Sequence, residues 1–338
     1  MKYLMSSYNL VAKNNLNSKI RSQVKEGFLL KMTDGHSTGF AVCQVWEELG
    51  SHPLRDQLAS LKKYLVSNNT SDLLPIISRA LFYARMDFDN RKNKIDVFSD
   101  KKLPNSYFLI SQISGYDFSH LLPGETYKVK MGIDLTVETL GLKKLVEKGC
   151  RLRLDFNANI SKSQMIRWLE EGAKELLPAI DYIEDPCNYN YADWLDLKTL
   201  YPTLRLALDM EFEVFFKSDF KFQKEKCFDV LVIKPASQNV VKMIALAKRH
   251  ELRFVITSFM SHALDQVITL FEAMNWQGHP LYFGSGLITH EVYEQDDFFK
   301  KIKLNDSKIY LEEAGYGWGF TQELDALKWT EIRGTHAH

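Results

Sequence analysis

From about residue 107 to residue 286, short apolar runs alternate with longer segments whose apolar residues recur at helical spacing. Eight runs have the length and composition of strands, and they cover residues 107–113, 126–131, 151–156, 181–185, 205–210, 230–234, 253–258 and 281–286. After the third run, Ser161 is a suitable N-cap for a helix over residues 163–177. This helix would carry Met165, Trp168, Leu169, Leu176 and Leu177 on or near one stripe. Eight such strand-and-helix units predict an α/β fold with a parallel (β/α)8 barrel.

The first 106 residues follow a different pattern. GFLLKM, the turn DGHSTG and FAVCQVW predict a β-hairpin, and the segments LRDQLASLKKYLV and LLPIISRALFYARMDFDNRK that follow predict helices. We therefore expect an α+β capping domain over residues 1–106, a barrel over 107–304 and a C-terminal tail over 305–338. Aromatic residues predict that this tail packs on the capping domain, namely Tyr310, Tyr316, Trp318, Phe320 and Trp329.

Five of the predicted strands end in a charged residue: Lys130, Asp155, Glu184, Asp209 and Lys234. They are 25, 29, 25 and 25 residues apart, about one strand-and-helix unit each time. Because barrel enzymes carry their active sites at the C-terminal ends of the strands, we expect all five at one mouth. A single charged strand end is often a helix cap or a solubilising residue. Five at this regular spacing indicate an active site.

Side-chain alternation along a strand predicts which further residues share this mouth. Lys128 lies on the same face as Lys130, and Arg153 and Asn157 lie on the same face as Asp155. We expect Lys128 to support its neighbour and Arg153 to pair with a nearby carboxylate, because a buried charge needs a partner.

The three carboxylates suit a hard divalent cation, since oxygen ligands favour Mg²⁺, with Mn²⁺ as a substitute. No His or Cys stands at these positions to favour zinc. A metal flanked by lysines is typical of proton abstraction next to a carboxylate, in which the metal stabilises the enediolate and a lysine takes the proton.

The last two predicted strands end in Ser258 and in the pair Ser285 and Gly286. Their hydroxyl and backbone N–H groups would hold a carboxylate of the substrate. The alternative is that they only cap helices and form tight turns.

The composition of the chain indicates which kinds of partner and which location to expect. The chain has 43 Lys and Arg and 43 Asp and Glu, which favours a small-molecule substrate over nucleic acid or an acidic membrane surface. The chemistry of the charged strand ends indicates that this substrate is a carboxylate. The four cysteines form no CxxC pair, so we expect neither a zinc knuckle nor a disulfide framework but a reducing, cytoplasmic location. No secretory h-region or apolar run of about 18 residues is present, which argues against secretion and membrane spanning. The oligomeric state is left open.

Five motifs together resemble the enolase superfamily: KVK at 128–130, LRLDFN at 152–157, IEDP at 183–186, LALDM at 206–210 and VIKP at 232–235. Within that superfamily the chain is most similar to the o-succinylbenzoate synthase family, a similarity that extends to the first hairpin. The resemblance implies a capping domain completed by the C-terminal tail. It also implies that Asp155, Glu184 and Asp209 bind Mg²⁺.

The same resemblance implies a reaction. Lys130 would remove the α-proton of 2-succinyl-6-hydroxy-2,4-cyclohexadiene-1-carboxylate and then help the hydroxyl to leave, giving 2-succinylbenzoate for menaquinone biosynthesis. Lys234 would stabilise the enediolate from the opposite side, and Lys128 would support Lys130. The closing cap loop would lie near residues 13–24. Met210 stands where the family often has Glu, so Glu211 is a candidate for supporting the third ligand.

Other functions fit part of the pattern. Lysines on both sides of a substrate suit an N-acylamino acid racemase or a dipeptide epimerase with the same fold. A lysine on the sixth strand of a barrel also suits a Schiff-base aldolase that uses Lys234. A non-catalytic binding barrel would not require all five charged groups.

Overall fold

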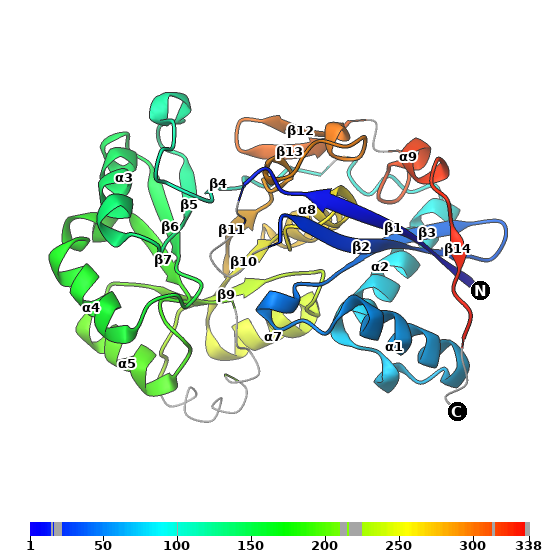
Figure 1. Cartoon of the computed structure of the whole chain (residues 1–338), viewed down its shortest axis with the longest axis horizontal. Helices are drawn as coiled ribbons and strands as arrows, with labels where there is room; N and C mark the ends of the chain where they lie inside the picture. The colour runs from blue at the N-terminus through cyan, green and yellow to red at the C-terminus, as the bar shows by residue number, and fades with distance from the viewer. Residues whose placement is uncertain are drawn as a thin grey trace.

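The computed structural model describes residues 1–14, 16, 22–99, 101–209, 215, 225–312 and 315–334. Figure 1 shows two parts, a barrel surrounded by helices and an antiparallel sheet backed by two helices. Much of the predicted cap loop lies outside the described residues, as do Met210 and Glu211.

The barrel is an eight-stranded parallel sheet in sequential order. Its strands are β4 (Phe108–Ile110), β5 (Thr126–Lys130), β6 (Arg151–Asp155), β7 (Ile180–Glu184), β8 (Leu206–Leu208), β9 (Val230–Ile233), β10 (Arg253–Thr257) and β11 (Tyr282–Gly286). A parallel bridge between Ser106 and Ser285, with Tyr107 N donating to Ser285 O at 3.0 Å, joins the first and last strands. The predicted barrel and all eight of its strands are confirmed.

Helices follow most of the strands, and they are α3 (Leu135–Glu147), α4 (Lys162–Glu171), α5 (Tyr191–Leu200), α7 (Val240–His250) and α8 (Ala263–Trp276). Ser161 caps α4 as predicted, and its side chain forms a capping box with Gln164. The helix is shorter than the sequence suggested, because it ends at Glu171 and a 3-10 helix, Lys174–Ala179, takes over. Pro178 within that turn cannot donate the backbone hydrogen bond that a continued α-helix would need.

The barrel interior is closed below its mouth by a small apolar cluster. Its members point inward from four adjacent strands, and they are Tyr182, Ala207, Val230, Val232 and Val255. Since alternate residues face the same side, the inward positions two residues later fall at the C-terminal rim. Those positions hold Glu184, Asp209 and Lys234.

The second part is a four-stranded antiparallel sheet in the order β14, β1, β2, β3. It consists of β1 (Lys2–Val11), β2 (Val24–Thr33), β3 (Thr38–Gln44) and β14 (Thr330–Glu331), with α1 (Leu54–Ser67) and α2 (Pro75–Lys92). The predicted hairpin is therefore the pair β2 and β3. We refer to this part as the cap.

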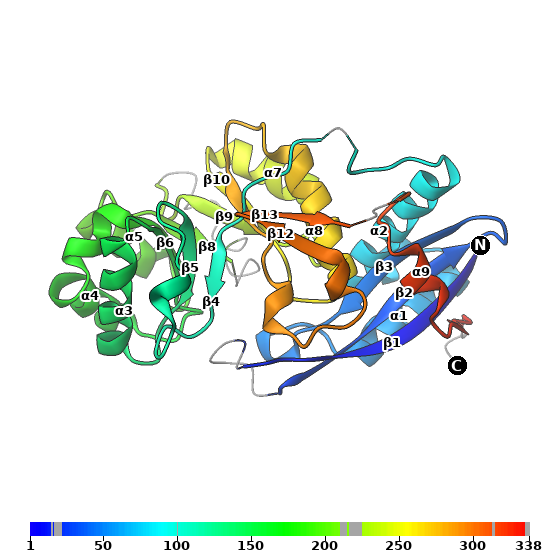
Figure 2. The ribbon, with the colours of Figure 1, turned by 90° about the horizontal axis from the view of Figure 1, so that it is seen from above.

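The end of the chain returns to the cap (Figure 2). After the barrel come β12 (Ile302–Asn305), β13 (Lys308–Leu311) and α9 (Thr321–Asp325). Trp318 Nε1 donates to Tyr83 O at 3.3 Å, and Ile332 N donates to Tyr3 O at 2.8 Å. The end of the chain therefore packs on the cap, and the boundaries at 1–106, 107–304 and 305–338 stay a prediction. Within the described ranges, no helix is long and apolar enough to cross a membrane.

Candidate active site

The ends of β5, β6 and β7 bring two lysines and two carboxylates together. Lys128 Nζ lies 2.6 Å from Glu184 Oε1 and 2.9 Å from Asp155 Oδ2. Lys130 Nζ lies 2.6 Å from the same oxygen of Asp155. The parallel register that pairs Lys130 with Asp155 and Asp155 with Glu184 places these three residues at one level of the barrel, and Lys128 lies two residues earlier in β5.

Burial and charge act against each other in this cluster. Burial opposes the charge on Lys128, but Asp155 and Glu184 outweigh it and raise the pKa of Lys128 well above its usual range. Burial also favours neutral Asp155, and the two lysines overcome it and lower the pKa of that carboxyl. For Glu184, burial and the charge of Asp155 prevail over Lys128, so its pKa is raised.

Lys234 and Asp209 form a second ion pair, joined through Nζ and Oδ2, just beyond β9 and β8. The backbone N–H of Asp209 donates to Asp185 Oδ1 at 3.1 Å. Burial would lower the pKa of Lys234, but Asp209 and Glu184 raise it. A Schiff-base nucleophile must be a neutral amine, so this environment argues against an aldolase that uses Lys234.

Two carboxylate oxygens at this mouth are suited to a cation. Glu184 Oε2 and Asp209 Oδ1 are buried and have no hydrogen-bond partner among the described residues. Unpaired carboxylate oxygens are the ligands that Mg²⁺ prefers. Asp155 and Asp209 are paired with lysines in this structure. Among the described residues, no group of three His, Cys, Asp or Glu side chains is arranged to hold a metal ion.

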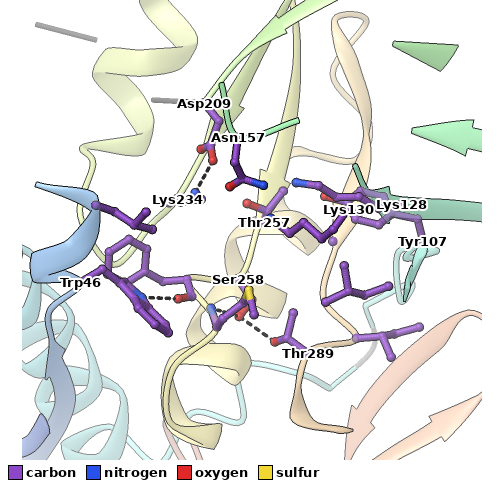
Figure 3. Close-up of a pocket in the computed structure, with 16 residues that line it drawn as sticks. Trp46, Tyr107, Lys128, Lys130, Asn157, Asp209, Lys234, Thr257, Ser258 and Thr289 are labelled. Carbon is purple, nitrogen blue, oxygen red and sulfur yellow. Dashed lines mark hydrogen bonds and ion pairs between the residues drawn. The ribbon is translucent and has the colours of Figure 1, made fainter. Parts of the chain in front are cut away.

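A pocket opens above these ion pairs (Figure 3). Figure 3 shows Lys128 and Lys130 on one side of it and Lys234 on the other. Sixteen residues line it, and they are Trp46, Leu49, Tyr107, Leu109, Lys128, Lys130, Asn157, Asp209, Lys234, Thr257, Ser258, Phe259, Met260, Gly286, Ile288 and Thr289. The lining combines lysines on both sides with apolar side chains, which suits a small anionic ligand.

Three predicted residues from the ends of β6, β10 and β11 lie in this lining. They are Asn157, Ser258 and Gly286. The Ser258 hydroxyl accepts hydrogen bonds from Met260 N at 3.0 Å and from Thr289 Oγ1 at 2.8 Å. A Cβ on Gly286 would lie 2.2 Å from the hydroxyl of Tyr107, so no side chain fits there.

Two predicted residues lie outside the lining. The hydroxyl of Ser285 donates to Asn105 O at 2.8 Å, next to the bridge that closes the barrel. Arg153 lies deeper, where it donates to Phe283 O at 2.6 Å and approaches Asp181 Oδ2 at 3.5 Å. Its guanidinium also stacks on aromatic rings, with 4.7 Å to the Tyr107 centroid. Both therefore have partners within the protein outside the pocket lining, and a role for either in substrate binding stays a prediction.

Sequence reasoning missed the part of the pocket that comes from the cap. Trp46 and Leu49 follow β3 and lie in the lining beside barrel residues more than 200 positions away. Tyr107, at the start of the first barrel strand, was also missed. The tryptophan at the end of the FAVCQVW run was a visible signal, but a local pattern does not show which surface it meets.

Comparison with known proteins agrees with this geometry. Residues 3–90 match the family model described as O-succinylbenzoate synthase, N-terminal domain. The o-succinylbenzoate synthase of Bdellovibrio bacteriovorus is 31% identical over 98% of this chain and 99% of its own length. The chain belongs to the o-succinylbenzoate synthase family. It is therefore an enzyme of the lyase class.

Solved structures of related enzymes share the fold of this o-succinylbenzoate synthase family member. The L-Ala-D/L-Glu epimerase of Bacillus subtilis superposes with a TM-score of 0.73 at 14% identity, covering 94% of this chain and 98% of its own. The o-succinylbenzoate synthase of Thermosynechococcus elongatus, which has magnesium in its active site, gives 0.66 at 17% identity over 87% and 95%. The fold is that of the enolase superfamily.

Proposed function

We propose that this enzyme dehydrates 2-succinyl-6-hydroxy-2,4-cyclohexadiene-1-carboxylate to 2-succinylbenzoate, a step of menaquinone biosynthesis in the cytoplasm. The main supporting observation is that Lys130 and Lys234 lie on opposite sides of one pocket, each paired with a carboxylate. Family membership supports the substrate. All four cysteines are buried free thiols, which is compatible with a reducing compartment.

Lys130 is the proposed acid and base. Its amine takes the proton from the carbon next to the substrate carboxylate, and the electron pair of that bond moves into an enediolate. The ammonium then returns the proton to the hydroxyl on the same side of the ring, which leaves as water. The ring becomes aromatic, so the elimination is downhill and the main barrier is the acidity of the first proton.

Lys234 and Lys128 have electrostatic roles in this proposal. Lys234 stays an ammonium, as its raised pKa favours, and faces the developing negative charge from across the pocket. Lys128 also stays charged beside Asp155 and Glu184. It shares Oδ2 of Asp155 with Lys130 and so supports the position of that amine.

Asp155, Glu184 and Asp209 would hold Mg²⁺, for which Mn²⁺ would substitute. When bound, the cation supplies positive charge that stabilises the substrate enediolate. Two of the three ligands have an unpaired buried oxygen for it. Asn157, Ser258 and the backbone of Gly286 line the same pocket and would bind the substrate or support its position.

The test is an assay of the loss of the cyclohexadiene chromophore. The unmodified protein should be active with Mg²⁺, inactive after EDTA treatment, and active again when Mg²⁺ is restored. Lys130→Ala with Mg²⁺ present should be slower than the unmodified protein by about 10²–10⁴-fold. A folded protein that does not consume the cyclohexadiene with Mg²⁺ present would refute the proposed substrate.

A dipeptide epimerase or N-acylamino acid racemase is the second candidate, because lysines face the pocket from both sides. The B. subtilis epimerase and the dipeptide epimerase of Cytophaga hutchinsonii both superpose with a TM-score of 0.73. Incubation in D₂O separates the two functions. Deuterium incorporation and inversion at the α-carbon of a dipeptide or an N-acylamino acid, without dehydration of the cyclohexadiene, would favour the second candidate.

A further inference from the structure

Three cap side chains donate hydrogen bonds to backbone carbonyls of the barrel. The bonds are Arg79 Nε to Pro235 O at 3.3 Å, Trp46 Nε1 to Phe259 O at 2.8 Å and Gln44 Nε2 to Met260 O at 3.3 Å. The acceptors lie in the loops that follow two neighbouring strands, β9 and β10. Pro235 directly follows Lys234, and Phe259 directly follows Ser258, so each acceptor adjoins a pocket residue.

Arg79 is held firmly on the cap side. It is a buried residue of α2, with 8% of its surface exposed. Its guanidinium lies 4.3 Å from the Phe82 ring centroid and 4.7 Å from that of Tyr83. The Tyr83 hydroxyl donates to Glu272 Oε1 at 2.6 Å. Burial raises the pKa of Glu272, and the positive charge of Arg79 partly offsets this rise. Stacking and charge therefore fix this donor in a single direction.

The backbone around Lys234 is held from the barrel side as well. Its N–H donates to Gln238 Oε1 at 2.8 Å, and its carbonyl accepts from Ser237 N and Gln238 N. Pro235 has no N–H, so its carbonyl is the polar backbone group through which a neighbour can hold it. The bond from Arg79 meets that carbonyl.

We infer that Arg79 is a positioning residue for Lys234, through which the cap sets the placement of the ammonium that faces Lys130. The inference rests on the proposed electrostatic role of Lys234. A displaced ammonium still meets the bound substrate but stabilises the enediolate less well. Loss of Arg79 therefore lowers kcat and leaves KM nearly unchanged.

Arg79→Met tests this, because methionine keeps an apolar stem but cannot donate. We expect kcat for dehydration to fall by about 10²-fold with little change in KM. Arg85→Met is the matched control on the same helix. The Arg85 guanidinium is largely exposed, lies 5.5 Å from the Phe88 centroid and pairs with Asp89 at 3.0 Å. This control should keep the kcat of the unmodified enzyme.

Amide hydrogen exchange is the second readout and needs no turnover. In Arg79→Met, peptides that cover residues 230–238 should exchange faster than in the unmodified protein, while those covering residues 151–157 keep their rate. If the unmodified protein does not dehydrate the cyclohexadiene, the proposed function fails, and the exchange experiment still decides whether Arg79 holds this loop.

Two results would overturn the inference. One is a kcat for Arg79→Met equal to that of Arg85→Met. The other is amide hydrogen exchange that becomes as fast throughout α2 and the cap sheet as in residues 230–238. Should Arg79→Met fail to fold, Arg79→Lys retains the charge and the stem but loses the Nε donor. It should then show a lowered kcat, unchanged KM and the same local increase in exchange. Normal kcat in the folded Arg79→Lys protein would equally overturn the inference.

Discussion

The ammonium nitrogen of Lys130 lies 2.6 Å from Oδ2 of Asp155 on the neighbouring strand. That oxygen also accepts Lys128 at 2.9 Å, so one carboxylate oxygen is shared by two lysines. The proposed base and a proposed metal ligand are thus direct partners. A cation bound by Asp155 would compete with Lys130 for this carboxylate. Metal binding would therefore change the partner of the proposed base.

Replacing Lys130 by alanine should remove the acid and base while the fold is kept. We expect dehydration to slow by about 10²–10⁴-fold, the usual contribution of a general acid or base. Lys226→Ala is the control, since Lys226 is a largely exposed barrel residue whose ion pair with Glu251 is at the surface. The measurements are kcat and the far-UV circular dichroism of both variants. Activity within a fewfold of the unmodified enzyme would exclude the proposed role.

Glu184→Gln should weaken metal binding. Glu184 Oε2 is buried without a hydrogen-bond partner in the described ranges, and an amide loses the negative charge that attracts the cation. We expect the Mg²⁺ dissociation constant from titration calorimetry to rise more than about 100-fold, the upper end for loss of a supporting group. Glu48→Gln is the control, because Glu48 also pairs with a lysine but lies in the cap. Equal affinity in both variants would contradict the proposed ligand set.

His262 should make stability depend on pH. It packs between Tyr8 and Phe298, with ring centroids 4.7 and 4.6 Å away, and its Nδ1 accepts from Leu264 N at 3.1 Å. Burial lowers the pKa of His262 to about 3. Between that value and the pKa of about 6.5 in the unfolded chain, the unfolded state binds more protons. Above about pH 6.5 His262 therefore does not reduce the free energy of unfolding. Below that pH the free energy of unfolding decreases, and it continues to decrease as the pH falls toward 3.

From pH 7.5 to pH 5 this single group should cost about 2 kcal/mol of stability. Urea unfolding of the unmodified protein and of His262→Gln at both pH values measures it, because the variant lacks this component. His36→Gln, at an exposed position in the turn between β2 and β3, should keep the full pH dependence. Identical pH dependence in His262→Gln and the unmodified protein would show that burial does not suppress protonation of His262.

Asp87→Ala should destabilise the junction between cap and tail. Asp87 accepts from Trp318 N at 2.7 Å, from Phe40 N at 2.9 Å and from Arg91 Nε at 2.8 Å. Burial raises the pKa of Asp87 to about 6, so the carboxylate is ionised at pH 8. Its removal there takes the carboxylate partner from Arg91, whose guanidinium keeps only Gly319 O and Thr321 Oγ1, and leaves two buried N–H groups unpaired. We expect a loss of about 3–5 kcal/mol in urea unfolding.

The control for this variant lies two residues further along α2. Asp89→Ala removes a carboxylate whose ion pair with Arg85 is about half exposed, and such pairs contribute about 0–1 kcal/mol. A loss of similar size in both variants would mean that the buried network around Asp87 adds nothing beyond a surface pair.

The predicted barrel and its charged mouth depend on patterns that are local in the chain. Their positions at the ends of successive strands predicted that Asp155, Glu184 and Asp209 meet at one mouth. In the structure Glu184 and Asp209 take the inward-facing positions above Tyr182 and Ala207. Such patterns say nothing of how a sheet closes. Ser285 was predicted to bind substrate, yet its hydroxyl contacts Asn105 O, because the closing seam lies beside it.

The sequence by itself determined the eight strands, the five charged residues at their ends and the side of each strand from which they point, since spacing and pleat are set by neighbours in the chain. Only the tertiary structure decided that Lys130 shares Asp155 with Lys128, that Trp46 completes the pocket and that Arg79 reaches Pro235. Those relationships join residues that lie 25 to 213 positions apart along the chain. They depend on how whole elements pack and exclude water, which no local pattern encodes.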